Sequence, residues 1–204
     1  MTTDWKDALH TLPGVLMIVG PAVALAAACG LRAFLPLLAL SVAAHTGAVH
    51  LGPQAAWFAS DAALWILGLA TVIEVLGDKV PLLDHLLDAA ATFVRPAAGA
   101  VVAWAAYGHW APQLAWPAAI IVGAGALGVH LVKAKTRLGS TALTLGHGNP
   151  LLSLGEDVLC LALSSMVWVG PLLALLAVAL AVAFVAALAA LRTPGAGGKL
   201  PRAN

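Results

Sequence analysis

The chain has 204 residues, of which 62% are hydrophobic and 9% are charged, and its mean hydropathy is +0.98. This composition argues against an ordinary soluble domain, and a net charge of +1 without a long basic run argues against a nucleic-acid partner. The two cysteines, Cys29 and Cys160, lie in apolar surroundings, which argues against a disulfide framework. We therefore expect one all-α membrane domain over residues 1–204, with the lipid bilayer around it.

A transmembrane helix needs roughly 20 apolar residues, and runs of that kind fill most of the chain. Charges and turn residues divide them into expected helices near 13–31, 34–48, 57–77, 96–110, 116–136, 150–169 and 171–192. The slightly acidic leader, with Asp4, Lys6 and Asp7, favours a first helix that stays attached over a cleaved signal peptide. We expect residues 193–204 to form a disordered tail.

Two further segments add to this polytopic bundle of about six or seven transmembrane helices. Residues 81–93 alternate leucines with Asp84 and Asp88, which is typical of an amphipathic helix at the membrane interface. Residues 139–150 are uncharged and rich in Gly, Ser and Thr, and they fit either a re-entrant segment or an ordinary loop.

Two X-Pro helix starts, each preceded by a lysine at the same distance, suggest an internal repeat. Arg95-Pro96 and Asn149-Pro150 are each expected to open a helix, the second with Asn149 as its cap, and Lys79 and Lys133 precede the two prolines by the same distance. Repeats with helix breaks at matching positions are typical of transporters. Residues 13–110 and 116–192 are the expected halves.

Terminal charges and aromatic residues indicate an orientation. The aromatic residues fall at the expected helix ends opposite to the basic ones, as an interfacial belt would: Trp5, Trp57, Tyr107, Trp110, Trp116 and Trp168. Arg192, Lys199 and Arg202 make the C-terminal tail basic, so we expect it in the cytoplasm and the N-terminus outside, across the cytoplasmic (inner) membrane of the cell. Small residues recur at a spacing of four, as in Ala119 and Gly123, which favours a compact bundle of closely packed helices. Within this pattern we expect Gly125 and Gly128 to lie against a neighbouring helix. A homo-oligomer is among the partners that we consider.

Most charges between the chain ends fall in three short clusters, and ionisable groups at membrane depth are expensive enough to mark a function. We predict that the acids of these clusters converge on one site with basic counter-charges. The predicted ion- or substrate-binding residues are Glu74, Asp78, Glu156, Asp157, Asn149, Ser153 and His130. The predicted counter-charges, or anion-binding residues, are Arg32, Lys79, Arg95, Lys133 and Arg137. Asp84, His85 and Asp88 are candidate metal ligands, the alternative being that these acids face water on the amphipathic helix.

Five motifs together resemble a known membrane family. They are Gly30-Leu-Arg32-Ala-Phe-Leu-Pro36, Asp78-Lys79-Val-Pro81 with Asp84-His85 and Asp88, Phe93-Val-Arg95-Pro96, Lys133-Ala-Lys-Thr-Arg137, and Asn149-Pro150 with Ser153 and Glu156-Asp157. The family is called domain of unknown function 4126, and the resemblance covers roughly residues 15–190. It implies a membrane-embedded helical fold and no particular activity. Separately, Glu74-Val-Leu-Gly77-Asp78-Lys79 is similar to the Glu-x-Gly-Asp-Lys signature of manganese and calcium exporters, with one extra residue between Glu and Gly.

Three classes of function compete. A small transporter or channel accounts for the clustered charges and broken helices, and we favour a cation, either a metal ion or a coupling proton, because the acids lie at the helix ends nearest the core. The alternatives are a transporter or binder of a small anion or lipid headgroup, and a non-catalytic membrane scaffold. An enzyme is least favoured, because no known order of catalytic residues matches. A bound metal ion is the only cofactor that the residues suggest.

Overall fold

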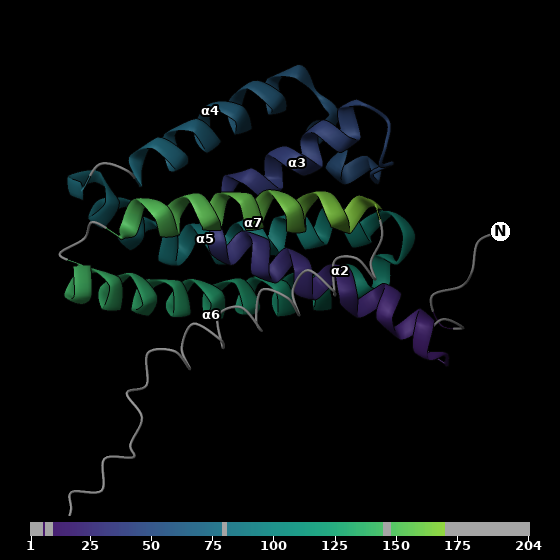
Figure 1. Ribbon diagram of the computed structural model, residues 1–204. Coiled ribbons are helices and arrows are strands. Elements are labelled where there is room, and N and C mark those ends of the chain that lie inside the picture. The colour runs from purple at the N-terminus through teal and green to yellow at the C-terminus, as the bar shows by residue number, and fades with distance from the viewer. Residues whose placement is uncertain (1–5, 7–9, 79–80, 145–147, 170–204) are drawn as a thin grey trace, which may run out of the picture.

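The computed structural model describes residues 6, 10–78, 81–144 and 148–169. Within these ranges the chain forms only helices: α2 (Leu12–Leu31), α3 (Phe34–His45), the 3-10 helix η1 (Pro53–Ala59), α4 (Asp61–Gly77), α5 (Pro81–Trp110), α6 (Pro112–Thr144) and α7 (Asn149–Val169) (Figure 1). The all-α helical bundle expected from the composition is confirmed. The expected helix 171–192 and the tail lie outside the described residues.

Local sequence explains several helix ends. The side chain of Thr11 accepts a hydrogen bond from the backbone N–H of Gly14 at the start of α2, and that of Ser60 accepts one from Ala63 at the start of α4. Pro112 opens α6, where a missing N–H costs nothing. Arg32 ends α2 because its backbone is extended, and a new helix begins at Phe34.

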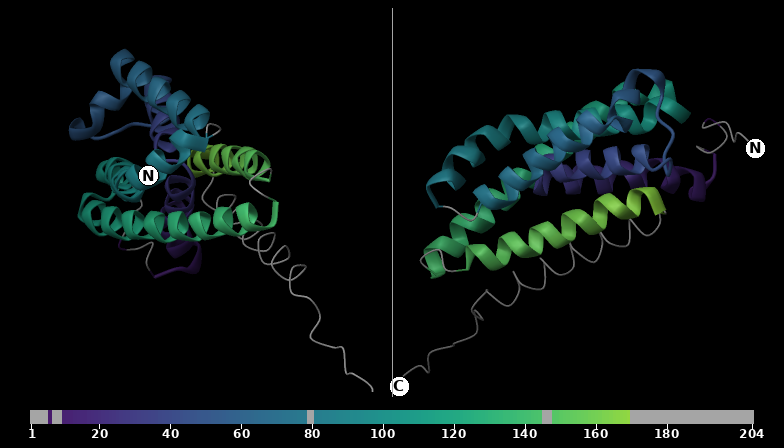
Figure 2. Two further views of the ribbon diagram at one scale, coloured as in Figure 1. Left: turned by 90° about the vertical axis from the view of Figure 1, so that its left-hand side faces the viewer. Right: turned by 90° about the horizontal axis from the view of Figure 1, so that it is seen from above.

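Helix α2 lies near the centre of the bundle, where it contacts α3, α5, α6 and α7 (Figure 2). Its residues Ala24, Leu25, Ala28 and Cys29 are fully or almost fully buried. The most extensive contact between two helices is that of α5 with α6, whereas α4 packs chiefly on α3 and touches α5 only lightly (Figure 1). Helix α4 is therefore at the edge of the bundle and packs loosely beside α5.

Glycines set the contact distances of α6. A Cβ atom on Gly123 would lie 2.9 Å from the carbonyl oxygen of Pro96 in α5, and one on Gly125 would lie 2.9 Å from the Cβ of Ala26 in α2. The prediction for Gly125 is confirmed. The prediction for Gly128 is wrong for the described part of the chain, because a Cβ there would meet none of the described residues within 4 Å. Residues 125 and 128 lie close in sequence, but of the two only the first points at a described partner helix.

Several expected boundaries are wrong. The amphipathic segment 81–93 is not separate, because α5 runs unbroken through Pro96 to Trp110. A proline inside a helix removes one hydrogen bond, yet such prolines are tolerated where neighbouring helices support the backbone, and here Pro96 lies against Gly123 of α6. Since Pro96 does not open a helix while Pro150 lies in the first turn of α7, the matched helix starts behind the proposed repeat are not present.

Residues 139–150, for which a re-entrant segment and an ordinary loop were both left open, begin as neither. Helix α6 continues to Thr144, so the first half of 139–150 is its last turns, and residues 145–147 lie outside the described part. The Gly and Ser content of this stretch suggested a break, but helical hydrogen bonding inside a packed bundle outweighs such weak local preferences. Helix α3 is shorter than expected as well, with 12 residues in place of 34–48, which is too few to cross a bilayer alone.

Three helical stretches are long and apolar enough to cross a membrane: Leu12–Leu31, Ala89–His109 and Pro112–Leu143. A fourth results if η1 and α4, which meet at a bend of 66°, are counted as one span. These assignments rest on length and composition. They fit the apolar side chains that the bundle exposes, such as Trp65, Phe93 and Ile120, which are 70% exposed or more.

Candidate functional site

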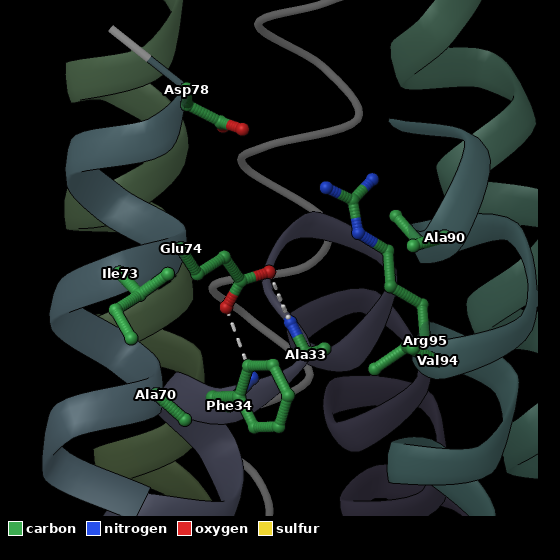
Figure 3. Close-up of a pocket in the computed structure, with 10 residues that line it drawn as sticks. Ala33, Phe34, Ala70, Ile73, Glu74, Asp78, Ala90, Val94 and Arg95 are labelled. Carbon is green, nitrogen blue, oxygen red and sulfur yellow. Dashed lines mark hydrogen bonds between the residues drawn. The ribbon is translucent and has the colours of Figure 1, made fainter. Parts of the chain in front are cut away.

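The site begins at the break between α2 and α3. Because Arg32 ends α2, the backbone N–H groups of Ala33 and Phe34 lack partners inside a helix. The carboxylate of Glu74, from α4, accepts both, at 2.8 Å from Ala33 and 3.0 Å from Phe34 (Figure 3). Glu74 therefore caps α3 from another helix. Because Glu74 is only 7% exposed, this cap is buried.

Arg32 binds two acids from different helices. Its guanidinium forms an ion pair with Asp78 at the end of α4, and its Nε donates to Oδ1 of Asp157 in α7 at 2.6 Å. Its Nη2 also donates to the hydroxyl of Ser153, at 2.9 Å. The planar fork of arginine suits such divergent partners, which a lysine could not satisfy together.

Two bases of α6 complete the arrangement. Nζ of Lys133 lies 2.9 Å from Oε2 of Glu156 and 3.6 Å from Oδ2 of Asp78, and it donates to the carbonyl oxygen of Leu31 at 3.0 Å. Nη2 of Arg137 lies 2.9 Å from Asp78 and 2.8 Å from Glu156. We call the six side chains the ion-pair cluster: Arg32, Asp78, Lys133, Arg137, Glu156 and Asp157.

The ion-pair cluster is buried, but not evenly. The side chains of Arg32, Lys133 and Asp78 are at most 2% exposed, whereas those of Glu156 and Asp157 are 14% and 18% exposed. Burial alone would raise the pKa of Asp78, but the cations of Lys133, Arg32 and Arg137 outweigh it and hold that pKa below its ordinary value. Asp78 therefore stays ionised, and the more accessible edge of the cluster lies on α7.

A second polar group lies on the α5 side. The guanidinium of Arg95, 1% exposed, contacts Nδ1 of His130 in α6, and Nε2 of His130 lies 3.3 Å from the hydroxyl of Thr92. Since a guanidinium can only donate, Nδ1 accepts, which assigns a neutral imidazole with its proton on Nε2. Thr92 was not among the predicted residues, although it precedes Arg95 by three positions and so shares its helix face.

A cavity of about 250 Å³ separates α4 from α5 at this level. Glu74 and Asp78 line its α4 wall, Arg95 lines its α5 wall, and Phe34, Ile73 and Val94 are among the apolar side chains around it (Figure 3). The cavity thus borders both the cap of α3 and the ion-pair cluster.

The structure brings most of the predicted site residues to one end of the bundle. The ion-pair cluster holds Arg32, Asp78, Lys133, Arg137, Glu156 and Asp157, and Ser153 hydrogen-bonds to it. Glu74 caps α3 beside the cluster, and Arg95 and His130 form the second polar group. Asn149 does not join them. Its side-chain amide donates to the hydroxyl of Thr141, and its Oδ1, expected to cap the helix, has no hydrogen-bond partner among the described residues. Lys79 and the side chains of Asp84, His85 and Asp88 lie outside the described residues. Among the described residues, no group of three His, Cys, Asp or Glu side chains is arranged to hold a metal ion.

The fold and the charge cluster define a class: a polytopic helical bundle of membrane type with a buried ion-pair network at one end. Within that class, the chain belongs to the family described as Domain of unknown function (DUF4126), whose family model matches residues 19–191. No curated protein and no solved structure matches the chain. The similarity of Glu74–Lys79 to exporter signatures gains no support from the family match.

Proposed function

We propose that this protein is a small integral membrane transporter in which a cation, either a metal ion or a coupling proton, moves by way of the carboxylates of the ion-pair cluster. The observation that carries this proposal is the burial of three acids and three bases from four segments in direct contact. Taking an ion out of water costs several kcal/mol, and apolar contacts would hold the same helices at lower cost. Charges kept at such a place mark ion pathways in membrane proteins.

The uneven exposure of the cluster supports a cation over an anion. Glu156 and Asp157 form its accessible edge, while Arg32 and Lys133 lie behind them. A cation that arrives from solvent meets carboxylates first, and an anion is repelled by them. A site for an anion would instead need the basic side chains at the accessible edge of the cluster.

The same contacts provide a mechanism that couples binding of the cation to movement of the helices. Glu156 holds Lys133 and Arg137 and so joins α7 to α6, and Asp78 joins α4 to Arg32 and Arg137. When a cation or proton occupies one of these carboxylates, the base that it held loses its partner. The helices that the pair joined are then free to separate, which links occupancy of the site to opening of this end of the bundle.

Glu156→Gln is the sharpest test, because Oε2 of Glu156 accepts from both bases and an amide oxygen can take its place without the charge. Purified protein in liposomes is screened with fluorescent reporters for metal ions, for protons and for small anions. We expect cation flux in the parent and background flux in Glu156→Gln. The control is Asp61→Asn, which removes a carboxylate that is 84% exposed at the start of α4, and it keeps the parent flux.

Full flux in Glu156→Gln removes the cluster from the pathway and favours a scaffold that the ion pairs merely hold together. Flux of anions alone overturns the choice of a cation.

A further inference from the structure

Polar side chains continue from the ion-pair cluster along the face of α7 that contacts α2. On this face Ser153 and Asp157 bind Arg32 at the end of α2. One turn further along α7, Sγ of Cys160 donates a hydrogen bond to the carbonyl oxygen of Ala28 in α2, at 3.3 Å. Spacings of three and four residues keep side chains on one helix face. We call the resulting line the α7 polar stripe: Ser153, Asp157, Cys160 and Ser164.

The inner part of the α7 polar stripe lies in the apolar interior of the bundle. Cys160 is 0% exposed and Ser164 is 1% exposed, and Leu25 of α2 and Leu163 of α7 are as deeply buried. At a rise of about 1.5 Å per residue the stripe is about 16 Å long, which is about half the thickness of the hydrocarbon core of a bilayer. Polar groups at such depth cost free energy, so a continuous line of them calls for a role.

Ser164 forms the inner end of the stripe and differs from the serine beside it. Its side chain interacts with that of Cys160, yet its oxygen has no hydrogen bond of regular geometry in the part of the chain that the structure describes. The exposed Ser165 instead donates to the carbonyl oxygen of Leu161, at 2.8 Å. Ordered water commonly supplies the bond that a buried hydroxyl lacks, so the oxygen of Ser164 is suited to hold a water molecule.

The chemistry of the stripe suits a proton better than a metal ion. A hydroxyl and a thiol each carry one proton and also offer an electron pair, so each can accept a proton on one side and release one on the other. A hard metal ion needs several oxygen ligands at once. Beyond Asp157 the stripe offers only the donating thiol of Cys160 and the hydroxyl of Ser164, which are both neutral.

We propose that the α7 polar stripe carries protons between the accessible edge of the ion-pair cluster and water beyond Ser164. A proton from solvent first binds the carboxylate of Asp157, where an O–H bond forms. In one concerted shift the sulfur of Cys160 takes up that proton, the earlier proton of Cys160 passes to the oxygen of Ser164, and the hydroxyl proton of Ser164 passes to water. Each bond to hydrogen that forms is matched by one that breaks, so the shift needs no oxidant or reductant.

This inference rests on the proposed transport function and names the proton as its cation. It requires two residues, Cys160 and Ser164, that the ion-pair cluster does not contain. The two proposals therefore fail in different variants.

A pair of neighbouring serines tests the inner end of the stripe. The purified full chain is reconstituted in liposomes that contain a pH-sensitive dye, with potassium and valinomycin to hold the membrane potential at zero. After a step in external pH, Ser165→Ala should show the proton flux of the parent, and Ser164→Ala should be about a hundredfold slower, the lower end of what one positioned proton-transfer group contributes.

Melting temperature separates a role in proton transfer from a role in packing. Because the oxygen of Ser164 has no regular hydrogen bond to the described part of the protein, Ser164→Ala should melt at the temperature of the parent or above it. Parental flux in Ser164→Ala overturns the proposal. A loss of flux that comes with a lower melting temperature overturns it as well.

The thiol of Cys160 is tested by a conservative replacement. Cys160→Ala removes the group that carries the proton, whereas Cys160→Ser supplies a hydroxyl that both accepts and donates. We expect Cys160→Ala to be as slow as Ser164→Ala and Cys160→Ser to recover most of the lost flux. Cys29→Ala removes an equally buried thiol of α2 outside the stripe and keeps the parent's flux. Equal flux in the two Cys160 variants overturns the route.

Further results distinguish this inference from the proposed function. Metal-ion flux without proton flux in the parent overturns the proton route and leaves cation transport in place. Proton flux that Ser164→Ala loses and Glu156→Gln keeps supports the stripe and removes Glu156 and its bases from the pathway. A parent that moves no cation overturns both proposals.

Discussion

Asp78 is the residue at which the helices of this site meet. One of its oxygens, Oδ2, pairs with Arg32 and Arg137 and lies 3.6 Å from Lys133. The three bases come from the α2–α3 break and from α6, so a single carboxylate joins α4 to both. A buried carboxylate with this many cations is stabilised as the ion, and each cation depends on it in turn.

The first prediction concerns acid stability. Burial alone raises the pKa of Asp78, but Lys133, Arg32 and Arg137 together hold it below its ordinary value. A carboxyl of this kind stabilises the folded state above its unfolded pKa of about 3.9 and loses that contribution as the pH falls through the lower folded value. We expect the melting temperature in detergent to fall steeply only below about pH 4, and Asp78→Asn to be less stable at neutral pH with a shallower acid limb. An identical acid limb in the variant would contradict this.

A pair of lysines two positions apart provides the second prediction. Lys133 is 5% exposed and pairs with Glu156, whereas Lys135 is exposed. Removing one partner of a buried pair leaves the other uncompensated, so Lys133→Gln should cost about 3 kcal/mol of unfolding free energy. Lys135→Gln should change it by less than about 0.5 kcal/mol. Denaturant unfolding of both variants in mild detergent measures the two free energies. Equal free energies of unfolding would show that the buried ion pair of Lys133 does not stabilise the fold.

At the scale of elements, the start of α3 depends on a residue far away in the sequence. Helices usually begin with a capping side chain just before the first turn, but Ala33 has none to offer. Glu74, 41 positions later, supplies both acceptors. The break at Arg32 and the cap at Glu74 therefore belong together, since the first creates the free N–H groups that the second satisfies.

The third prediction follows from this cap. Glu74→Gln replaces one of two acceptor oxygens by a donor, so one backbone N–H of α3 loses its partner at a cost of about 1–3 kcal/mol. We expect faster hydrogen–deuterium exchange at Ala33 and Phe34 and unchanged exchange in α6. Unchanged exchange at both amides would show that the cap contributes little. For the same reason, Glu156→Gln is a cleaner probe of transport than Glu74→Gln.

The fourth prediction compares two glycines of α6. A larger side chain at Gly123 collides with the backbone of Pro96, whereas a Cβ atom on Gly128 would meet none of the described residues within 4 Å. Gly123→Leu should force α5 and α6 apart and lose the monodisperse peak in size-exclusion chromatography. Gly128→Leu should elute like the parent. If Gly123→Leu also elutes like the parent, the contact of the two helices is more adaptable than the geometry indicates.

At the scale of the whole molecule, the charges gather at one end of the bundle. Arg32 and Asp78 follow the last turns of α2 and α4, Lys133 and Arg137 lie near the end of α6, and Glu156 lies near the start of α7. Helices that cross a membrane in alternating directions bring such positions together. The exposed glutamines Gln54 and Gln113 belong to η1 and to the first turn of α6, at the other ends of these helices.

The fifth prediction concerns orientation. We expect the segments 48–56 and 108–116, at one set of helix ends, outside the cell and the charged segments 78–95 and 133–149 in the cytoplasm, as the positive-inside rule requires. Single cysteines at Gln54 and Gln113 should react with an impermeant maleimide in intact cells, and one at Lys135 should not. Native Cys29 and Cys160 are fully buried, so they should add little background. Labelling at Lys135 alone would reverse the orientation.

The sequence alone determined the helical class, the family resemblance and nearly all side chains of the site. An apolar run is a signal spread over about twenty residues, which makes the presence of a helix easy to predict, and the sequence places the starts of α2 and α7 within one position. Charged residues stand out in so apolar a chain, so the site residues could be picked out before their partners were known. Only the tertiary structure decided the partners, because Arg32 binds Asp157 across 125 positions and Asp78 across 46, and no local pattern encodes such distances. It also decided that α5 passes through Pro96 and that Glu74 caps α3. Both outcomes depend on neighbouring helices, whose packing outweighs the local preference of a proline or of an uncapped helix end.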